Sequence, residues 1–435
     1  MNTCVVGLGK IGLPLAVQIA GRGHRVVGAD SNPEVVDLVN AGREPFPGEA
    51  ELAERLAAVV DAGLLTATTD TASAVSDSRT VIIVVPLVVG DDLTPDFTAL
   101  DAATSAVAPA LKPGTLVSYE TTLPVHTTRR RFAPMLAAGS GLQVGGDLFV
   151  CHSPERVFSG RIFADLRRYP KLVGGLEAAG ARRAVEFYAS VLEFDGRDDL
   201  PRPNGVWDLG SAEAAELAKL AETTYRNVNI AFANELAMAA DQVGVDVRAV
   251  IEASNSQPFS HIHQPGIAVG GHCIPVYPHF LLQGYPRAHL VRAGLDVNAG
   301  MPAYAVALLD DLLGGLDGKR VAVLGAAYRG GVKETAFSGV FPTVAALHGA
   351  GALVTVHDPL YSDVELEGMG FEPFHLGDAC DGAIVQADHA TYRTLSPEQL
   401  PGIRAIVDGR GLIAPEGWTG VPVRRIGDGG TPAGP

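Results

Sequence analysis

The sequence predicts an α/β protein made of two doubly wound domains that are joined by a long central helix. Three observations predict this fold class. A strand, a glycine-rich turn and a helix follow one another at the N-terminus, and the same alternation returns in the last third of the chain. The stretch between Pro203 and Pro258 contains no proline and repeats apolar residues at helical spacing. Each alternating region therefore has the order of a Rossmann-like domain.

Composition narrows the classes of function. A chain of 435 residues is long enough for two or three domains, each with its own core. Its apolar fraction of 47% and charged fraction of 19% are typical of soluble globular proteins. The net charge of −16 argues against DNA, RNA or anionic membranes as partners, because these need clustered Lys and Arg. A small anionic ligand held by local groups remains compatible with this charge.

The cysteines and apolar runs indicate the cellular compartment. The cysteines are far apart and form no CxxC pair, which indicates neither a zinc ribbon nor a disulfide framework; they are Cys4, Cys151, Cys273 and Cys380. The N-terminus enters a strand pattern at once and leaves no room for a signal peptide. The most apolar run, at 81–90, is too short to span a bilayer and contains a proline. We therefore expect a cytoplasmic protein.

The glycine-rich turn near the N-terminus predicts a dinucleotide site. The expected elements are a strand at 4–6, a helix at 13–20 and a strand at 24–30. Between the first two, Gly7, Gly9 and Gly12 form G-x-G-x-x-G, and Asp30 ends the next strand. The glycines let a pyrophosphate approach the helix N-terminus, and Asp30 would accept from a ribose 2′-hydroxyl but repel a 2′-phosphate. NAD is thus favoured over NADP; the alternative is a doubly wound domain that binds nothing.

Two later apolar runs, at 80–88 and 114–128, predict further buried parallel strands. The C-terminal ends of such strands face the cofactor. This places Glu120, Thr121 and Thr122 near a nicotinamide, although strands also end in threonine for no chemical reason.

The middle of the chain predicts one almost uninterrupted helix over 211–255. Ala214, Ala218 and Ala221 recur at helical spacing and would let another element approach closely. So long a helix is expected to link two domains and to form a homodimer interface. Lys219 lies on a largely apolar part of this helix, where a buried lysine is costly unless it is paired or used. The alternative is a lysine that reaches solvent along its apolar stem.

The last third predicts a second α/β domain. The alternation runs through 318–339, 352–359, 382–389 and 403–411. It lacks a full G-x-G-x-x-G, so we expect another ligand, or the base and phosphate of a nucleotide, in place of a second dinucleotide. The tail at 427–435 is expected to be disordered. The predicted domains are an NAD-binding domain at 1–203, a central helical dimerisation and catalytic region at 204–300, and a nucleotide-sugar-binding domain at 301–435.

The order of these motifs resembles the UDP-glucose/GDP-mannose dehydrogenase family, from residue 3 to about residue 412. The motifs are the first glycine turn, SPERV at 153–157, AKLAETTYRNVNIAFANELA at 218–237, GGHCIPV at 270–276, VLGAAYRG at 323–330 and VTVHDP at 354–359. A cysteine after paired glycines, downstream of a lysine-bearing helix, is specific to this family. The SPER and GGHCIPV forms are more similar to its N-acetylhexosamine branch.

The resemblance implies an NAD-dependent nucleotide-sugar 6-dehydrogenase. Such an enzyme oxidises the C6 alcohol of the sugar to the uronate in two hydride transfers, through a thiohemiacetal and a thioester on a cysteine. A UDP-hexose is the first choice of substrate and TDP-glucose the second. The sugar can be an N-acetylhexosamine, glucose or mannose, and GDP is a further possible carrier.

The same resemblance assigns roles to residues. Cys273 is the nucleophile, Lys219 stabilises the oxyanion and thiolate, Glu155 is the general base of thioester hydrolysis, and Thr122 positions water. The cofactor residues are Gly7, Gly9, Ile11, Gly12, Asp30 and Thr122. The substrate residues are Arg156, Lys219, Thr223, Gly270, Gly271, Tyr328, Arg329 and Arg410.

Blander interpretations compete with these roles. Cys273 could be an inert cysteine, and Glu155 a surface salt-bridge partner. His261, His263 and His272 lie near Cys273, but their spacing matches no standard ligand set, so no metal is predicted.

Several positions depart from the family pattern. They are Thr121 in place of Ser, His126 in place of Gly, Thr223 in place of Asn, Tyr277 in place of Asp and Ala336 in place of Arg. They indicate a divergent subgroup with altered sugar or base preference and a slower hydrolysis step. Two other functions stay open: a β-hydroxyacid dehydrogenase, which needs neither the cysteine nor the second α/β domain, and a degenerate homologue that only binds NAD or a nucleotide sugar.

Overall fold

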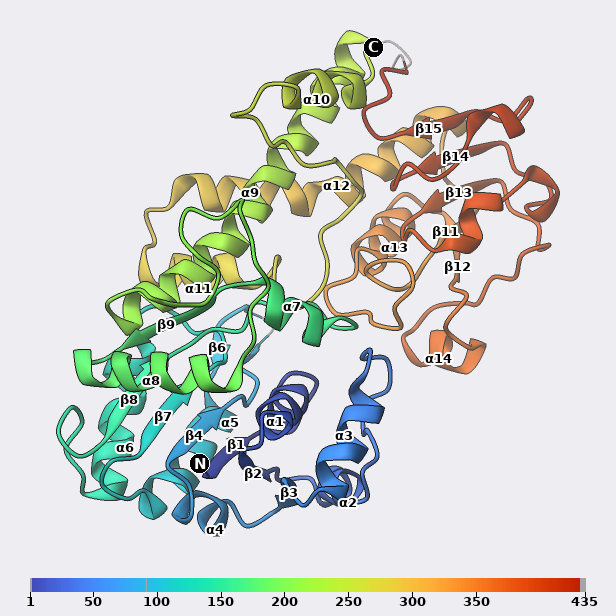
Figure 1. Cartoon of the computed structure of the whole chain (residues 1–435). Coiled ribbons are helices and arrows are strands. Elements are labelled where there is room, and N and C mark those ends of the chain that lie inside the picture. Colours follow the sequence, from blue (N-terminus) through green and yellow to red (C-terminus); the bar gives the residue numbers. More distant parts are fainter. Residues whose placement is uncertain (1, 91, 431–435) are drawn as a thin grey trace. The chain divides into compact units, whose positions relative to one another are not determined.

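A computed structural model describes residues 2–90 and 92–430 and divides into two compact units, Met1–Ala221 and Glu222–Pro435 (Figure 1). The division falls inside helix α9 (Ala212–Val243), which contributes to both units. Each unit is an α/β body with its own sheet, as the predicted fold class requires. The finer division into three domains stays a prediction.

Unit 1 is built on an eight-stranded sheet, counted over its described residues, in the order β10-β9-β8-β7-β4-β1-β2-β3. Its strands are β1 (Asn2–Val6), β2 (Arg25–Ala29), β3 (Leu65–Thr68), β4 (Thr80–Ile83), β7 (Leu116–Tyr119), β8 (Phe149–His152), β9 (Lys171–Gly175) and β10 (Val206–Asp208). All neighbours pair in parallel except β8 and β9, which are antiparallel. A separate ribbon joins β5 (Val88–Val89) and β6 (Pro95–Asp96).

Helices cover both faces of this sheet, so that the side chains of β1 alternate between two cores. Val5 packs with the cluster of α1, α2, α3, α7 and α8, whereas Cys4 and Val6 pack with that of α4, α5 and α6. The helices of unit 1 are α1 (Gly12–Gly21), α2 (Pro33–Asn40), α3 (Leu52–Asp61), α4 (Thr71–Ser76), α5 (Thr98–Val107), α6 (Ala133–Ser140), α7 (Ile162–Arg168) and α8 (Ala178–Val191). Short turns of helix are η1 (Ala108–Ala110) and η2 (Thr128–Phe132). This is the doubly wound arrangement expected from the sequence.

Two strands are shorter than the apolar runs that predict them. The run at 80–88 gives only β4, and the run at 114–128 gives only β7. Pro86 and Pro124 lie in these runs and lack the backbone N–H that a central strand needs. The polar residues beyond each strand therefore sit in loops at the carboxyl edge of the sheet.

The central helix is broken where the sequence predicts continuity. Helix α9 ends at Val243, and α10 (Val247–Asn255) follows after a short turn. Gly244 has a left-handed φ of 76°, which ends the first helix, and the Asp246 side chain accepts from the backbone N–H of Arg248 to begin the second. The long helix is confirmed, but it does not reach residue 255.

Unit 2 is built on a five-stranded parallel sheet, again counted over the described residues, in the order β12-β11-β13-β14-β15. The strands are β11 (Arg320–Leu324), β12 (Leu353–His357), β13 (Gly382–Val385), β14 (Ala405–Asp408) and β15 (Val423–Arg425). The further helices are α11 (Tyr277–Gly284), α12 (His289–Leu313), α13 (Val340–Gly349) and α14 (Asp363–Gly368), with short turns η3 (Ala390–Thr394), η4 (Pro397–Gln399) and η5 (Pro415–Gly417). The predicted second α/β domain is thus present.

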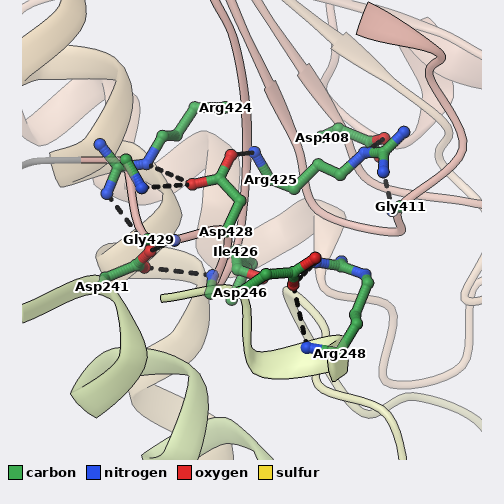
Figure 2. Close-up of polar contacts among 12 residues, drawn as sticks. Asp241, Asp246, Arg248, Asp408, Gly411, Arg424, Arg425, Ile426, Asp428 and Gly429 are labelled. Atoms are coloured by element: carbon green, nitrogen blue, oxygen red, sulfur yellow. Dashed lines mark hydrogen bonds and ion pairs between the residues drawn. The ribbon is translucent and has the colours of Figure 1, made fainter. Parts of the chain in front are cut away.

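The end of this sheet is fixed to α9 by a buried carboxylate (Figure 2). Asp241 accepts hydrogen bonds from the backbone N–H groups of Gly427 and Gly429, at 3.1 Å each, and from the Tyr304 hydroxyl at 2.6 Å. It also pairs with the Arg424 guanidinium at 3.3 Å. Residues 427–430 are therefore held by Asp241 and Asp428, contrary to the expected disorder, while 431–435 lie outside the described residues.

Among the residues that the structure describes, every helix is too short or too polar to cross a bilayer.

Candidate active site

The turn between β1 and α1 is packed tightly against protein at two of its three glycines and is open at the third. A Cβ on Gly7 would lie 3.2 Å from the backbone of Val84, and one on Gly12 would lie 1.9 Å from the Gly7 carbonyl oxygen. Gly7 also has a positive φ of 93°, which side chains disfavour. By contrast, no atom lies within 4 Å of a Cβ placed on Gly9, as an approaching pyrophosphate requires.

Asp30 lies at the end of β2, beside this turn. One of its oxygens accepts from the backbone N–H of Leu8 at 2.8 Å, and the other accepts from Asn32 at 2.9 Å. Each carboxylate oxygen can accept a further hydrogen bond, so these two bonds orient the side chain and leave it able to bind a ligand. The glycine turn and Asp30 therefore fit a dinucleotide whose ribose hydroxyls meet a carboxylate.

A second cluster lies at the carboxyl ends of β7 and β8, where the chain turns three charged side chains inward. The Lys171 ammonium lies 2.7 Å from a Glu120 oxygen and 2.8 Å from a Glu155 oxygen. The Lys171 side chain is 4% exposed, that of Glu120 is fully buried, and that of Glu155 is 12% exposed. This is one buried cation shared by two carboxylates.

Sheet topology brings the cluster together. β7 and β8 are parallel, with Tyr119 opposite His152, so the residues that follow both strands meet at one edge. β9 runs antiparallel to β8, with His152 opposite Gly174. The same register, continued by three residues, places Lys171, the first residue of β9, opposite Glu155. The antiparallel strand therefore begins with a cation at the edge of the sheet where the two parallel strands are followed by carboxylates.

Burial and charge act oppositely on the two carboxyl groups. Burial raises the pKa of Glu120 to about 7, against the attraction of Lys171 and with the repulsion of Glu155. Burial also acts to raise the pKa of Glu155, but the Lys171 ammonium, the backbone N–H of Arg156 and the charge of Lys219 together hold it below its usual value. At neutral pH Glu155 is therefore an anion, whereas Glu120 is close to its titration point.

Two further predicted residues of unit 1, Lys219 and Thr122, are buried. Lys219 is 9% exposed, and its charge acts on Glu155. Thr122 is buried two residues beyond Glu120, and the hydroxyl of its neighbour Thr121 donates to the Val85 carbonyl at 2.6 Å. The alternative of a solvent-reaching Lys219 does not fit this burial. The side chain of Glu155 is likewise not on the surface.

The substrate residue expected at Arg156 is partly engaged by the protein. Its Nη1 donates to the Pro170 carbonyl oxygen at 3.3 Å. It also lines a pocket together with Glu155 and Lys171. Thr223 lies one turn beyond Lys219 on α9 and is buried.

In unit 2, the loop that carries Cys273 is packed against the first turn after β11. A Cβ on Gly270 would lie 2.5 Å from the Cβ of Tyr328, and one on Gly271 would lie 3.1 Å from the Tyr328 ring. The backbone N–H of Gly271 donates to the Ala336 carbonyl at 2.8 Å. Both glycines are therefore needed for close packing, and they fix the backbone immediately before the cysteine.

Cys273 itself is free and half-buried, whereas the other three cysteines are buried. Its carbonyl oxygen accepts from the backbone N–H of Tyr277 at 2.9 Å, at the start of α11. Burial raises the pKa of Cys4, Cys151 and Cys380 to about 12, so those thiols stay protonated at neutral pH. Cys273 is thus the cysteine whose surroundings suit a nucleophile.

The Arg410 guanidinium joins three segments of unit 2 by hydrogen bonds. It donates to the carbonyl oxygens of Gln386 at 2.7 Å, Tyr328 at 3.2 Å and Ala268 at 3.4 Å. These bonds join the end of β13, the turn after β11 and the cysteine loop. Arg329, by contrast, is exposed, and its Nε lies 3.2 Å from the Tyr328 hydroxyl. Of the two arginines, Arg329 has the freer head group for a phosphate.

The departure at His126 has a structural consequence. Its φ is 75°, in the left-handed region where the family's glycine is favoured. The backbone N–H of His126 donates to Glu216 at 2.6 Å, and Thr128 donates to the same carboxylate through its N–H at 2.8 Å and its hydroxyl at 2.7 Å. The Glu216 carboxylate therefore holds a conformation that histidine alone disfavours. The other four departures have no comparable signature in backbone angles; they are Thr121, Thr223, Tyr277 and Ala336.

The chain is similar to known proteins over most of its length. The UDP-glucose/GDP-mannose dehydrogenase family matches through its NAD binding domain at residues 1–192, its central domain at 213–299 and its UDP binding domain at 322–415. The UDP-N-acetyl-D-mannosamine dehydrogenase of Pyrococcus horikoshii is 35% identical over 99% of this chain and 100% of its own length.

The chain belongs to the UDP-glucose/GDP-mannose dehydrogenase family.

Further comparisons agree with this assignment. An NDP-N-acetyl-D-galactosaminuronic acid dehydrogenase of Ralstonia solanacearum is 32% identical over 94% of this chain and 95% of its own. The solved structure of the UDP-D-ManNAc dehydrogenase from Pyrococcus horikoshii has a TM-score of 0.86 at 34% identity, covering 99% of this chain and 100% of that one. The protein is therefore an NAD-dependent oxidoreductase with a UDP binding domain. The predicted family, fold class and cofactor are confirmed.

Removal of the shared cation tests the cluster. Lys171→Met leaves two carboxylates without their partner, and we expect it to lower the free energy of unfolding at pH 8 by about 3–5 kcal/mol. The loss should shrink as the pH falls, because both carboxyl groups then become neutral. Chemical denaturation measures it, with the exposed Lys112→Met as the control, expected within about 0.5 kcal/mol of the parent. Equal losses in both variants would contradict a buried shared charge.

The left-handed backbone at His126 leads to a second prediction. His126→Val places a β-branched side chain at a left-handed φ, so it should be less stable than His126→Gly by about 1–2 kcal/mol. His126 is exposed, so neither change disturbs a core. Thermal unfolding of the pair measures the difference. A valine variant as stable as the glycine variant would show that the left-handed backbone is not retained.

Proposed function

We propose that the protein is a nucleotide-sugar 6-dehydrogenase that oxidises the C6 alcohol of a UDP-N-acetylhexosamine to the uronate. The observation that carries the proposal is the half-buried free thiol of Cys273, on a loop fixed by packed glycines, in a chain of this family. The names of the relatives favour an N-acetylmannosamine or N-acetylgalactosamine derivative. TDP-glucose remains the second choice.

In the proposed chemistry, each residue keeps the role that the resemblance to the family assigns to it. Two molecules of NAD, bound one after the other, would supply the hydride acceptors of the two oxidations, and Gly7, Gly9, Gly12 and Asp30 would hold each of them. Loss of a hydride and of the hydroxyl proton converts the C6 alcohol to an aldehyde. The sulfur of Cys273 then bonds to C6, and the aldehyde oxygen takes up the thiol proton to give a thiohemiacetal. Lys219 would donate to that oxygen while it carries negative charge.

The second half of the reaction ends on water. The thiohemiacetal loses a hydride and its hydroxyl proton and becomes a thioester. Glu155 removes a proton from water, the water oxygen bonds to C6, and the C–S bond breaks. The sulfur regains a proton, and the carboxylic acid ionises. The lowered pKa of Glu155 supports this role, since a base must be ionised before it can accept a proton.

Two further observations bear on the expected substrate class and on the expected homodimer. The presence of the UDP binding domain at 322–415 favours a nucleotide sugar over a β-hydroxyacid. Tyr225 and Phe232, seven residues apart on α9, are 53% and 47% exposed, which favours the homodimer through this helix. The cytoplasmic location stays a prediction.

A substrate panel tests the proposal. NADH formation is followed by absorbance with UDP-, TDP- and GDP-hexoses, including the N-acetylated ones. We expect two NADH per sugar for one UDP-N-acetylhexosamine, and no uronate from Cys273→Ala. Cys380→Ala, which changes a buried thiol in the same unit, serves as the control and should retain activity. NAD binding without NADH from any sugar would favour the degenerate homologue, and full activity of Cys273→Ala would favour a β-hydroxyacid-type reaction.

A further inference from the structure

The two carboxylates that share Lys171 lie in different surroundings. Glu155 borders the pocket lined also by Arg156 and Lys171, whereas Glu120 is fully buried behind the ammonium. Both oxygens of Glu120 are engaged by protein, one by Lys171 and the other by the Tyr188 hydroxyl. Glu155 therefore borders a cavity, whereas the oxygens of Glu120 are both bound by protein groups.

Two hydrogen bonds fix the orientation of the Glu155 carboxylate. One oxygen accepts from Lys171 at 2.8 Å, and the other accepts from the backbone N–H of Arg156 at 2.6 Å. Each oxygen keeps a lone pair for a further donor. A carboxylate held at both oxygens cannot rotate freely, so its remaining lone pairs have fixed directions.

Lys171 is itself held from behind. Its ammonium donates to Glu120 at 2.7 Å and lies 4.9 Å from the centre of the Tyr188 ring. The Tyr188 hydroxyl donates to Glu120 and lies 2.8 Å from the Ser118 hydroxyl. The chain of contacts from Ser118 to Glu155 runs through buried groups of β7, α8 and β9.

We infer that Lys171 and Glu120 are positioning residues for the general base, with Lys171 fixing the Glu155 carboxylate and Glu120 setting how strongly that ammonium holds it. The inference rests on the proposed function, because it concerns the hydrolysis step assigned to Glu155. Neither Lys171 nor Glu120 touches the reacting atoms in this account. Both act through Glu155.

The charge on Glu120 controls the basicity of Glu155. When Glu120 is neutral, Lys171 is attracted to one anion and keeps the proton affinity of Glu155 low. When Glu120 ionises, the repulsion between the two carboxylates raises the proton affinity of Glu155 and makes it a stronger base. Since burial raises the pKa of Glu120 to about 7, this change falls in the neutral range. Hydrolysis should therefore become faster as the pH rises through about 7.

His152, Tyr188 and Lys171 keep their charge states across this range. His152, on β8, has its pKa lowered to about 3 by burial and by Lys171, so it stays neutral. Burial keeps the pKa of Tyr188 well above its usual value, and the two carboxylates raise the pKa of Lys171 against the effect of burial. Lys219, on α9, adds a positive charge that acts on Glu155. Glu120 is thus the group of this cluster that titrates near neutrality.

The test isolates the hydrolysis step. Single turnovers are quenched in acid at times after mixing, and intact-protein mass spectrometry follows decay of the sugar adduct on Cys273 between pH 6 and pH 9. Glu120→Gln keeps the shape of the side chain, since its amide oxygen can accept from Lys171 and its amide nitrogen can donate to the Tyr188 oxygen. We expect adduct decay to lose its rise with pH and to be about 3- to 10-fold slower at pH 8. Formation of the adduct should be unchanged.

A matched control separates this effect from any loss of a buried carboxylate. Glu216 is buried in the same unit, and its pKa is also raised to about 7 by burial, but it binds His126 and Thr128. Glu216→Gln should therefore keep the rise in hydrolysis rate with pH. If Glu120→Gln does not fold, Tyr188→Phe replaces it. That change removes a donor to the ionised Glu120, so it should move the rise to higher pH.

The possible results distinguish failure of the positioning role from failure of the proposed function. Equal pH profiles for adduct decay in the parent and in Glu120→Gln, or an unmoved profile in Tyr188→Phe, would overturn the positioning role while leaving the dehydrogenase function intact. Absence of both NADH and adduct in the parent would instead overturn the proposed function, and this inference with it. Loss of the rise in Glu120→Gln but not in Glu216→Gln would support it.

Discussion

One buried ammonium holds the candidate site of unit 1 together. Lys171 lies between Glu120 and Glu155, and neither carboxylate could be buried as an anion without it. Removing a cation from water is unfavourable unless its hydrogen bonds are replaced, and two short contacts to carboxylates replace them here. The result is a pair of carboxyl groups with opposite pKa shifts only one side chain apart. In such a pair one carboxyl group is ionised and the other titrates near neutral pH, and protein groups alone produce this difference.

The sheet explains how these groups meet. Parallel strands place their carboxyl ends at one edge, which is where a doubly wound domain binds its ligands. The reversed strand β9 starts at that edge, so its first residue, Lys171, reaches residues that follow β7 and β8. A parallel β9 would have put Lys171 at the opposite edge of the sheet. Among the described strands of this sheet, the antiparallel pairing of β8 with β9 is therefore a condition for the charge cluster.

The sequence predicts those parts of the molecule that depend on local patterns. Gly7 and Gly12 are recognisable because their spacing is tied to one turn, and the structure leaves no room there for a side chain. The long helix is recognisable from its period, but its end at Gly244 depends on a left-handed residue that periodicity does not reveal. Motif resemblance indicates Glu155. The sequence also predicts Glu120 beside a nicotinamide, but no pattern in it predicts the bond between Glu120 and Lys171. Lys171 gives one weak signal, a charged residue at the head of the apolar run LVGG. Its partners depend on the direction of β9, which no short stretch of sequence specifies.

Glu120, and not Glu155, is the carboxyl group of this cluster that titrates near pH 7. Infrared difference spectroscopy of carboxyl groups tests it directly, in a Glu216→Gln background that removes the other buried carboxyl with a pKa of about 7. We expect a protonated-carboxyl band that is present at pH 6, disappears as the pH rises through about 7, and is missing in Glu120→Gln. A band that persists in Glu120→Gln and is missing in Glu155→Gln would contradict it, because Glu155 would then be the protonated partner of Lys171.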